Sequence, residues 1–188
     1  MSTGGGWQDS LGGALNGIKL LTSEKGIRQT VKCEEIQIAQ ETKDELENRF
    51  CLIYSGQRRL ARNLLRTVMG KYISNDKGSV NALGAIQILA REMAVSLKEG
   101  DIDRFAELMN EHWELSKVLD SGCTNTCIDQ IFEICEDMID GKMICGAGGG
   151  GFLQVILKKG ITKEALDERL KDFFGLSGVS VWSSRFCW

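Results

Sequence analysis

A carboxylate follows a run of glycines near the start of the chain. Residues 3–9 read Thr-Gly-Gly-Gly-Trp-Gln-Asp, so that Asp9 stands directly after backbone with little side-chain cover. A carboxylate in such a place can accept a proton or hold a hydroxyl-rich ligand. In the structural alternative, Asp9 caps a short helical turn through Leu11 and the glycines are a loose start of the chain. Trp7 is likewise open to two interpretations, a core aromatic residue or a wall on which a sugar ring stacks.

A second glycine cluster lies near the other end of the chain. Its members are Gly146, Ala147, Gly148, Gly149, Gly150 and Gly151. They contain the GxGxxG pattern of dinucleotide-binding folds, which requires a helix after the turn. Residues 152–157 read Phe-Leu-Gln-Val-Ile-Leu, which predicts a strand instead. We therefore expect a glycine loop between two strands, with bare backbone N–H groups that suit an anion such as phosphate. The alternative is a loop whose glycines serve only positive φ angles or close packing.

Composition limits the classes of protein to which the chain can belong. Its 188 residues are 43% hydrophobic and 26% charged, which is typical of a folded globular chain and excludes a disordered or collagen-like one. The net charge of −3 leaves no polycationic surface, so we expect no nucleic-acid partner. No apolar run approaches the roughly 18 residues that cross a bilayer, and the N-terminus does not resemble a signal peptide. We expect neither a membrane nor secretion.

Cysteine and histidine usage argues against a metal site. The chain has seven cysteines without a CxxC pair, and its one histidine, His112, stands beside Trp113 in a stretch with helical periodicity. This excludes the common histidine-rich zinc sites and leaves only an all-cysteine arrangement. Reduced, mostly buried thiols in a cytoplasmic protein are the simpler interpretation, so we expect no metal ligands.

The segments before residue 55 would carry the first cluster. Two strands are expected over 14–21 and 28–34, joined by a turn. The charged stretch over 40–49 is expected to form a loop or a short solvated helix. A short buried strand over 50–54 follows, ending at a Ser-Gly pair.

The segments after residue 60 would carry the second cluster. Apolar stripes at helical spacing predict three helices between residues 60 and 116, and Asn125 or Thr126 can cap a fourth. The period then changes, with strands expected over 142–145, 152–157 and 179–182 and a helix over 162–174. This order predicts an α+β fold in which helices pack on an antiparallel sheet.

The two glycine motifs, in this order, resemble those of the L-fucose kinases in the GHMP kinase superfamily. Residues 3–9, followed by Gly12 and Gly13, are similar to the fucokinase signature. Gly146 to Gly151, followed by Phe152, resemble the third motif of the superfamily. Two intervening segments also match family patterns: Tyr54-Ser55-Gly56 with Arg59, and Leu119-Asp120-Ser121-Gly122 with Asn125. The resemblance extends over nearly the whole chain.

The resemblance implies a fold and a set of site residues. It implies a C-terminal GHMP-kinase domain with a ferredoxin-like antiparallel sheet over 50–188, and a small remnant of the N-terminal domain over 1–49. Asp9 matches the catalytic aspartate that contacts the attacking hydroxyl, and the second glycine cluster matches the loop that lines the active site. The implied substrate-binding residues are Gly5, Gly6, Trp7, Gln8 and Arg59. One departure is Ser10, where relatives have Gln, and this puts substrate identity and full activity in doubt.

The resemblance also implies a reaction and its partners. The implied activity is transfer of phosphate from ATP, with Mg²⁺, to the anomeric hydroxyl of L-fucose or a related sugar such as a heptose phosphate. Heptose kinases share a Gly-Gly-x-Gln-Asp core, and Trp7 with the third glycine favours fucose. The family's phosphate-binding motif, roughly Pro-x-Gly-Ser-Gly-Leu-Gly-Ser-Ser, does not occur in the 188 residues. The alternative is therefore a truncated, non-catalytic module that binds a sugar or a partner. In either case we expect association with an N-terminal kinase fragment or with itself.

Overall fold

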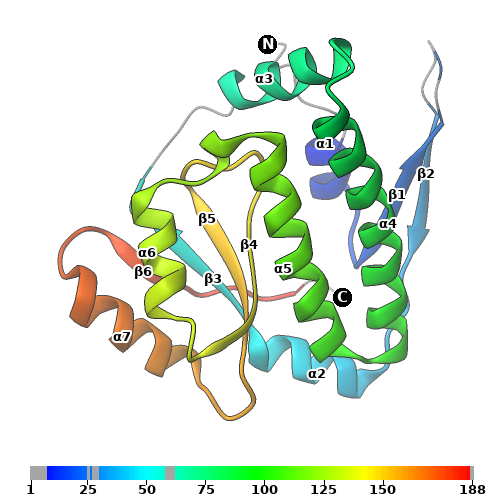
Figure 1. Ribbon diagram of the computed structural model, residues 1–188. Coiled ribbons are helices and arrows are strands. Elements are labelled where there is room, and N and C mark those ends of the chain that lie inside the picture. Colours follow the sequence, from blue (N-terminus) through cyan, green and yellow to red (C-terminus); the bar gives the residue numbers. More distant parts are fainter. Residues whose placement is uncertain (1–7, 25, 27–29, 58–61, 187–188) are drawn as a thin grey trace.

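The computed structural model describes residues 8–24, 26, 30–57 and 62–186, and the side chains of these residues except 8–10 and 62–65 (Figure 1). Its centre is a four-stranded sheet in the order β4-β5-β3-β6, in which all neighbouring strands are antiparallel. The strands are β3 (Phe50–Ser55), β4 (Ile139–Ile144), β5 (Phe152–Leu157) and β6 (Val179–Trp182). The strands expected over 50–54, 152–157 and 179–182 are thereby confirmed.

Helices cover one face of this sheet. Figure 1 shows α5 (Ile102–Leu119) and α6 (Thr126–Ile134) in front of the sheet, and α7 (Lys163–Phe174) follows β5. Along β3, alternate residues Cys51, Ile53 and Ser55 are buried, as expected of a strand with one covered face. The apolar stripes of α6 and α7 close the core over them, with Ile128, Ile131, Phe132, Leu166 and Leu170. The predicted α+β architecture of helices on an antiparallel sheet is therefore confirmed.

A second core joins the N-terminal segments to the long helices. It contains Ile36, Leu46, Ala94, Leu97 and Met109, together with Ile156 of β5. The core draws on β1 (Lys19–Ser23), α2 (Gln40–Arg49), α4 (Lys77–Glu99), α5 and Ile36, which directly follows β2 (Val31–Glu35). β1 and β2 form a separate antiparallel ribbon, seen at the right of Figure 1.

Two sequence expectations for the N-terminal segments need correction. The strand expected over 14–21 begins only at Lys19, because residues up to Ala14 form the helix α1 (Gln8–Ala14). The stretch over 40–49 is the helix α2, and it is not wholly solvated, since Thr42, Leu46 and Arg49 are buried. Leu46 packs into the second core, which explains why a charged sequence is held as a helix here.

Arg49, the last residue of α2, is a charged residue with a buried side chain. Its Nε donates to the Leu157 carbonyl at 2.8 Å, and its Nη atoms lie 2.6 Å from Glu45, 2.7 Å from Asp103 and 2.8 Å from Asp140. Burial alone would lower the pKa of the guanidinium, but the hydrogen bonds to Asp103 and Glu45 outweigh it and raise the pKa. Arg49 thus ties α2 to α5, to the edge strand β4 and to the central strand β5.

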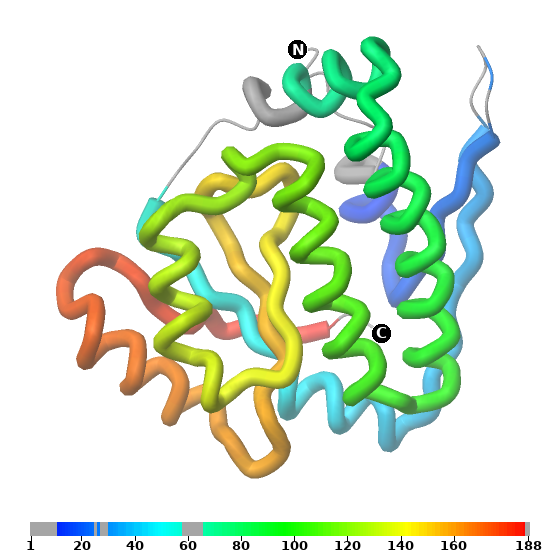
Figure 2. The backbone as a smooth tube through the Cα atoms, in the orientation of Figure 1, coloured from blue at the N-terminus to red at the C-terminus, as the bar shows by residue number. Residues whose placement is uncertain are grey.

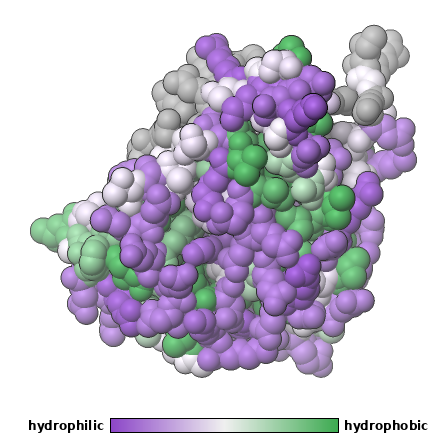
Figure 3. Space-filling model, viewed as in Figure 1, coloured by the Kyte–Doolittle hydropathy of each residue, from purple (hydrophilic) through white to green (hydrophobic). Residues whose placement is uncertain are grey.

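The outer helices leave apolar side chains exposed. Met69, Tyr72 and Ile73 of α3 (Arg62–Ile73) and Ile88 and Val95 of α4 are all at least half exposed. Figure 3 shows a largely hydrophilic face on which hydrophobic residues form separate patches. Among the described residues, α4 is long and apolar enough to cross a membrane by length and composition, which the sequence did not lead us to expect. Its buried Ala94 and Leu97 pack in the second core, as in a helix of a globular domain.

Candidate functional site

The glycine loop over 146–151 connects β4 to β5. The Cys145 N–H donates to the Phe152 carbonyl at 2.9 Å and closes the base of the loop. A strand, not a helix, leaves the loop, as the sequence predicts, so the GxGxxG pattern here is not a dinucleotide-binding turn. Figure 2 shows the loop beside the connection between α5 and α6.

The loop backbone takes conformations that favour glycine. All five of its glycines have positive φ, from 71° to 154°. Gly148 also lies against the turn η1 (Ser121–Cys123), where a Cβ atom would stand 2.5 Å from the Cys123 carbonyl oxygen. The positive φ angles and the close contact with Cys123 are sufficient structural reasons for glycine at these positions. A loop of bare backbone can also bind a ligand, so the two roles are compatible.

Three backbone hydrogen bonds anchor the loop to segments that are distant in sequence. Gly149 N–H donates to the Cys123 carbonyl at 2.6 Å, and Gly151 N–H donates to the Gln57 carbonyl at 2.9 Å. The Ser55 N–H in turn donates to the Gly151 carbonyl at 2.9 Å. The loop is thus held between η1 and the end of β3. The segments around Ser55 and Asp120, which match family patterns, are therefore both in contact with the glycine loop.

The remaining amides of the loop are free to bind a ligand. Within the described part of the chain, the N–H groups of Gly146, Ala147, Gly148 and Gly150 donate to no protein acceptor. Successive backbone amides of this kind bind anions such as phosphate. The N-terminus of α6 lies beside them, since its cap residue Asn125 contacts Gly149. The positive end of that helix favours a negative ligand at the same place.

Two alanine substitutions separate close packing from positive φ in this loop. A Cβ atom at Gly146 (φ +71°) would have no neighbouring atom within 4 Å, whereas one at Gly148 (φ +93°) would meet Cys123. Gly146→Ala should therefore lose only about 1 kcal/mol, from backbone strain. Gly148→Ala should lose a further 1–3 kcal/mol, roughly, from overpacking. Urea unfolding followed by circular dichroism measures both, and equal losses would contradict the close approach.

Ser55 belongs to a segment that matches the family pattern, but the sequence did not assign it to the site. It is 1% exposed, and within the described residues its Oγ has no hydrogen-bond partner. Buried hydroxyls are normally paired, commonly with an ordered water. The sequence carries a signal for this residue. Ser55 continues the alternation of buried residues along β3 and directly precedes the turn at Gly56.

The other predicted site residues are placed only in part. Gly5, Gly6, Trp7 and Arg59 lie outside the described residues. The backbone of Gln8 and Asp9 begins α1, and their side chains are outside the described ones. Figure 1 shows α1 toward the same end of the molecule as the β4–β5 loop. The meeting of Asp9 with the loop remains a prediction, as does the role of Arg59, which stands two residues after Gln57.

The thiols around the loop are not nucleophiles at neutral pH. Burial raises the pKa of Cys123, helped by the nearby Asp120, and burial also raises that of Cys145, to about 11 in each case. Roughly one molecule in 10⁴ would then carry either thiolate at pH 7. We expect iodoacetamide to alkylate the exposed Cys33 well before these two. Mass spectrometry of timed samples checks this, and equally fast labelling of Cys145 would refute it.

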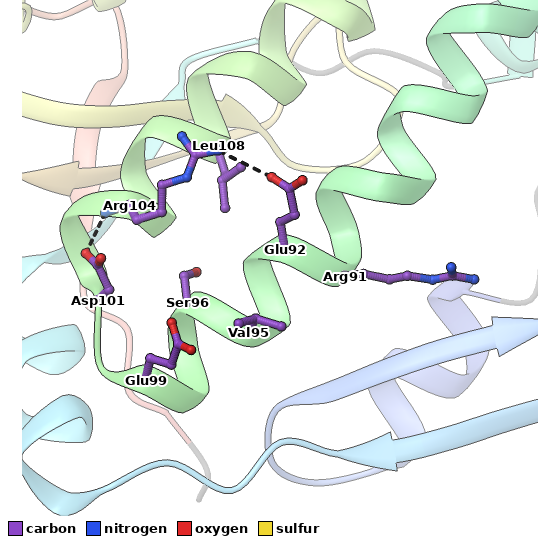
Figure 4. A pocket seen from close by; sticks show the side chains of 8 residues that line it. All are labelled: Arg91, Glu92, Val95, Ser96, Glu99, Asp101, Arg104 and Leu108. Carbon is purple, nitrogen blue, oxygen red and sulfur yellow. Dashed lines mark hydrogen bonds and ion pairs between the residues drawn. The ribbon is translucent and has the colours of Figure 1, made fainter.

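Two surface pockets lie away from the glycine loop. One of about 360 Å³ opens between α4 and α5, where Arg104 reaches Glu92 and Asp101 caps α5 (Figure 4). Arg91 points away from it in that view. The second is lined by Asp103, Glu107, Asp140, Lys158 and Lys159. No residue of the loop lines either pocket, so neither is the site to which the sequence motifs point. The described residues contain no group of His, Cys, Asp or Glu arranged to hold a metal ion.

Comparison with known sequences identifies relatives of this arrangement. Residues 93–175 match the family described as GHMP kinases C terminal. A bifunctional fucokinase/GDP-fucose pyrophosphorylase from Arabidopsis thaliana is 33% identical over 172 residues, or 92% of this chain and 16% of that protein. A D-glycero-alpha-D-manno-heptose 7-phosphate kinase from Campylobacter jejuni is 26% identical over 95% of this chain and 54% of that protein. The chain thus spans only part of the length of these relatives.

Comparison of structures supports the fold. The crystal structure of L. major mevalonate kinase in complex with R-mevalonate superposes with a TM-score of 0.71. The alignment covers 88% of this chain and 48% of the mevalonate kinase, at 16% sequence identity. At this identity the likeness concerns the fold alone, and it agrees with the α+β domain expected from the sequence.

Proposed function

We propose, on the premise that residues 93–175 form a GHMP kinase C-terminal domain, that the chain is the C-terminal part of an ATP-dependent sugar kinase. The observation that carries the proposal is the glycine loop, with four amides free of protein acceptors within the described residues. Phosphoryl transfer depends mainly on positioning and on stabilising charge at the phosphate oxygens. Free amides in a fixed loop provide both.

We propose L-fucose as the sugar. The chain is more similar to the fucokinase, at 33% identity, than to the heptose phosphate kinase, at 26%. The tryptophan at position 7 and the third glycine before it also favour fucose. The proposal divides the chain near residue 50, with residues 1–49 carrying Asp9 and residues 50–188 forming the C-terminal domain. We place the enzyme in the cytoplasm.

In the proposed reaction, the anomeric hydroxyl oxygen of the sugar attacks the γ-phosphorus of ATP. The bond between the γ-phosphorus and the bridging oxygen breaks, ADP leaves, and the hydroxyl proton passes to the Asp9 carboxylate. The loop amides hold oxygens of the phosphoryl group, and Gln8, Trp7 and Arg59 contact the sugar. Mg²⁺ would neutralise the phosphates when bound, but the described residues offer no ligand cluster for it.

A non-catalytic module is the second candidate. Two observations favour it: Ser10 replaces the usual Gln, and no Pro-x-Gly-Ser-Gly-Leu-Gly-Ser-Ser motif occurs in the 188 residues. Removing the main phosphate cradle is more damaging than removing a single base, because positioning contributes most of this catalysis. In that case the domain would bind a sugar or a partner chain without turnover.

An assay of ADP release distinguishes the two candidates. The chain is tested alone and mixed with an N-terminal fucokinase segment that carries the phosphate-binding motif, hereafter the complemented chain. L-fucose and D-glycero-D-manno-heptose 7-phosphate are compared as acceptors. We expect fucose-dependent ADP release from the complemented chain, and none from the chain or the added segment alone. Robust turnover by the lone chain would show that the N-terminal phosphate-binding motif is not needed for activity. A stable but inactive complex would favour the binding module.

A further inference from the structure

Asn125 stands at the junction of three elements of the candidate site. Its Oδ1 accepts the Ile128 N–H at 3.1 Å and so caps α6. Its Nδ2 lies 3.2 Å from the Gly149 carbonyl and 3.2 Å from Oε1 of Gln57. The side-chain amide therefore uses its acceptor for the helix and both of its donors for the glycine loop and the segment after β3.

Capping α6 does not require an asparagine at position 125. The other long helices with a side-chain cap, α4, α5 and α7, are capped by Asp76, Asp101 and Thr162, each accepting a backbone N–H of its own helix. Asp, Ser or Thr at position 125 would cap α6 as well as Asn does. Among these residues only Asn adds an N–H₂ group that can donate to two further acceptors.

We propose that Asn125 is a positioning residue that fixes the glycine loop relative to the segment leading into Arg59. The backbone bonds of the loop reach Cys123 on one side and Gln57 on the other, and the Asn125 side chain contacts the parts held by both. Holding Gly149 sets the direction of the neighbouring free amides, including that of Gly150. The inference rests on the proposed function of this loop as the holder of a phosphoryl group.

Two variants separate this role from helix capping. Asn125→Asp keeps an oxygen for the Ile128 N–H, but its ionised carboxylate repels the Gly149 carbonyl. Asn125→Ser keeps a capping hydroxyl and loses both donors. Asp101→Ser, at the start of α5, is the matched control because it exchanges a capping residue without touching the loop.

Amide hydrogen exchange of the chain, labelled with ¹⁵N-glycine and ¹⁵N-isoleucine, measures the effect. We expect the protection of the Gly149 amide to fall about tenfold in both Asn125 variants, as for the loss of one hydrogen bond. Protection of Ile128 should be unchanged, and Asp101→Ser should leave Gly149 as in the wild type. Lowering the pH through the pKa of the new carboxyl should restore protection in Asn125→Asp alone, because the protonated acid can donate. Unchanged Gly149 protection, or loss in parallel with Ile128, would overturn the proposal.

Kinetics of the complemented chain supply the second readout. We expect both Asn125 variants to lower kcat about tenfold with KM for ATP within twofold, since the loop acts on the transferred group. A released loop with unchanged kcat would also overturn the positioning role. The exchange measurement uses the chain alone, so an inactive wild-type complement would count against the proposed function and leave the test of Asn125 standing.

Discussion

Replacing Asp9 by Asn in the complemented chain is expected to lower kcat by about 10²–10⁴-fold, the usual contribution of a general base. The amide is nearly isosteric with the carboxylate but cannot take the proton of the attacking hydroxyl. The affinity for ATP should change little, because the loop amides and the N-terminal segment hold the phosphates. Steady-state kinetics with L-fucose gives both quantities.

The matched control is Asp44→Asn. Asp44 is an exposed carboxylate on α2, distant from the glycine motifs in sequence, and its conversion makes the same change of charge. It should leave kcat within twofold. If Asp9→Asn turned over as fast as this control, Asp9 would not be the base, and the similarity of residues 3–9 to the fucokinase signature would not extend to their chemistry.

Replacing Arg49 by Ala should lower the free energy of unfolding by about 3 kcal/mol, the lower end of the range for breaking a buried ion pair. The Arg49 side chain is 6% exposed and donates to three carboxylates and to a strand carbonyl. Without it, Glu45, Asp103 and Asp140 repel one another and the Leu157 carbonyl loses its donor. The lower end of the range applies because the carboxylates remain partly hydrated.

Arg104→Ala is the control for this change. Arg104 also has three acidic partners, Glu92, Glu107 and Glu111, but its side chain is 41% exposed and all three partners are about half exposed or more. Exposed ion pairs contribute little and partly replace one another, so the loss of unfolding free energy should be much smaller than for Arg49→Ala. Urea unfolding of both variants provides the comparison. Equal losses would mean that burial of Arg49 has no energetic consequence.

The elements that could be predicted from the sequence are those with a strong local pattern. The strand over 152–157 is bounded by a glycine run and a Lys-Lys-Gly turn, so both of its ends are marked. Ile102, Met109 and Trp113 follow helical spacing, and all three are buried in α5. The Asn125 cap of α6 could also be predicted, because N-cap preferences act within a few residues.

The features that could not be predicted depend on contacts distant in sequence. For the first residues the sequence suggested at most a short helical turn through Leu11, because Gly12 and Gly13 disfavour helices, yet the helix extends to Ala14. The burial of Arg49 depends on Asp103, Asp140 and Leu157, more than fifty residues away. The anchoring of the glycine loop by Cys123 and Gln57 likewise has no local signature.

The central claim, that this chain supplies the C-terminal part of a sugar kinase, is tested most directly by ³¹P NMR of the product. The complemented chain is incubated with ATP, Mg²⁺ and L-fucose, and the phosphorus spectrum is recorded with proton coupling. We predict a new phosphomonoester signal split by the anomeric proton of the sugar, formed only when both polypeptides are present. A stable complex of the two polypeptides that yields no sugar phosphate from L-fucose or from the heptose phosphate would contradict the claim.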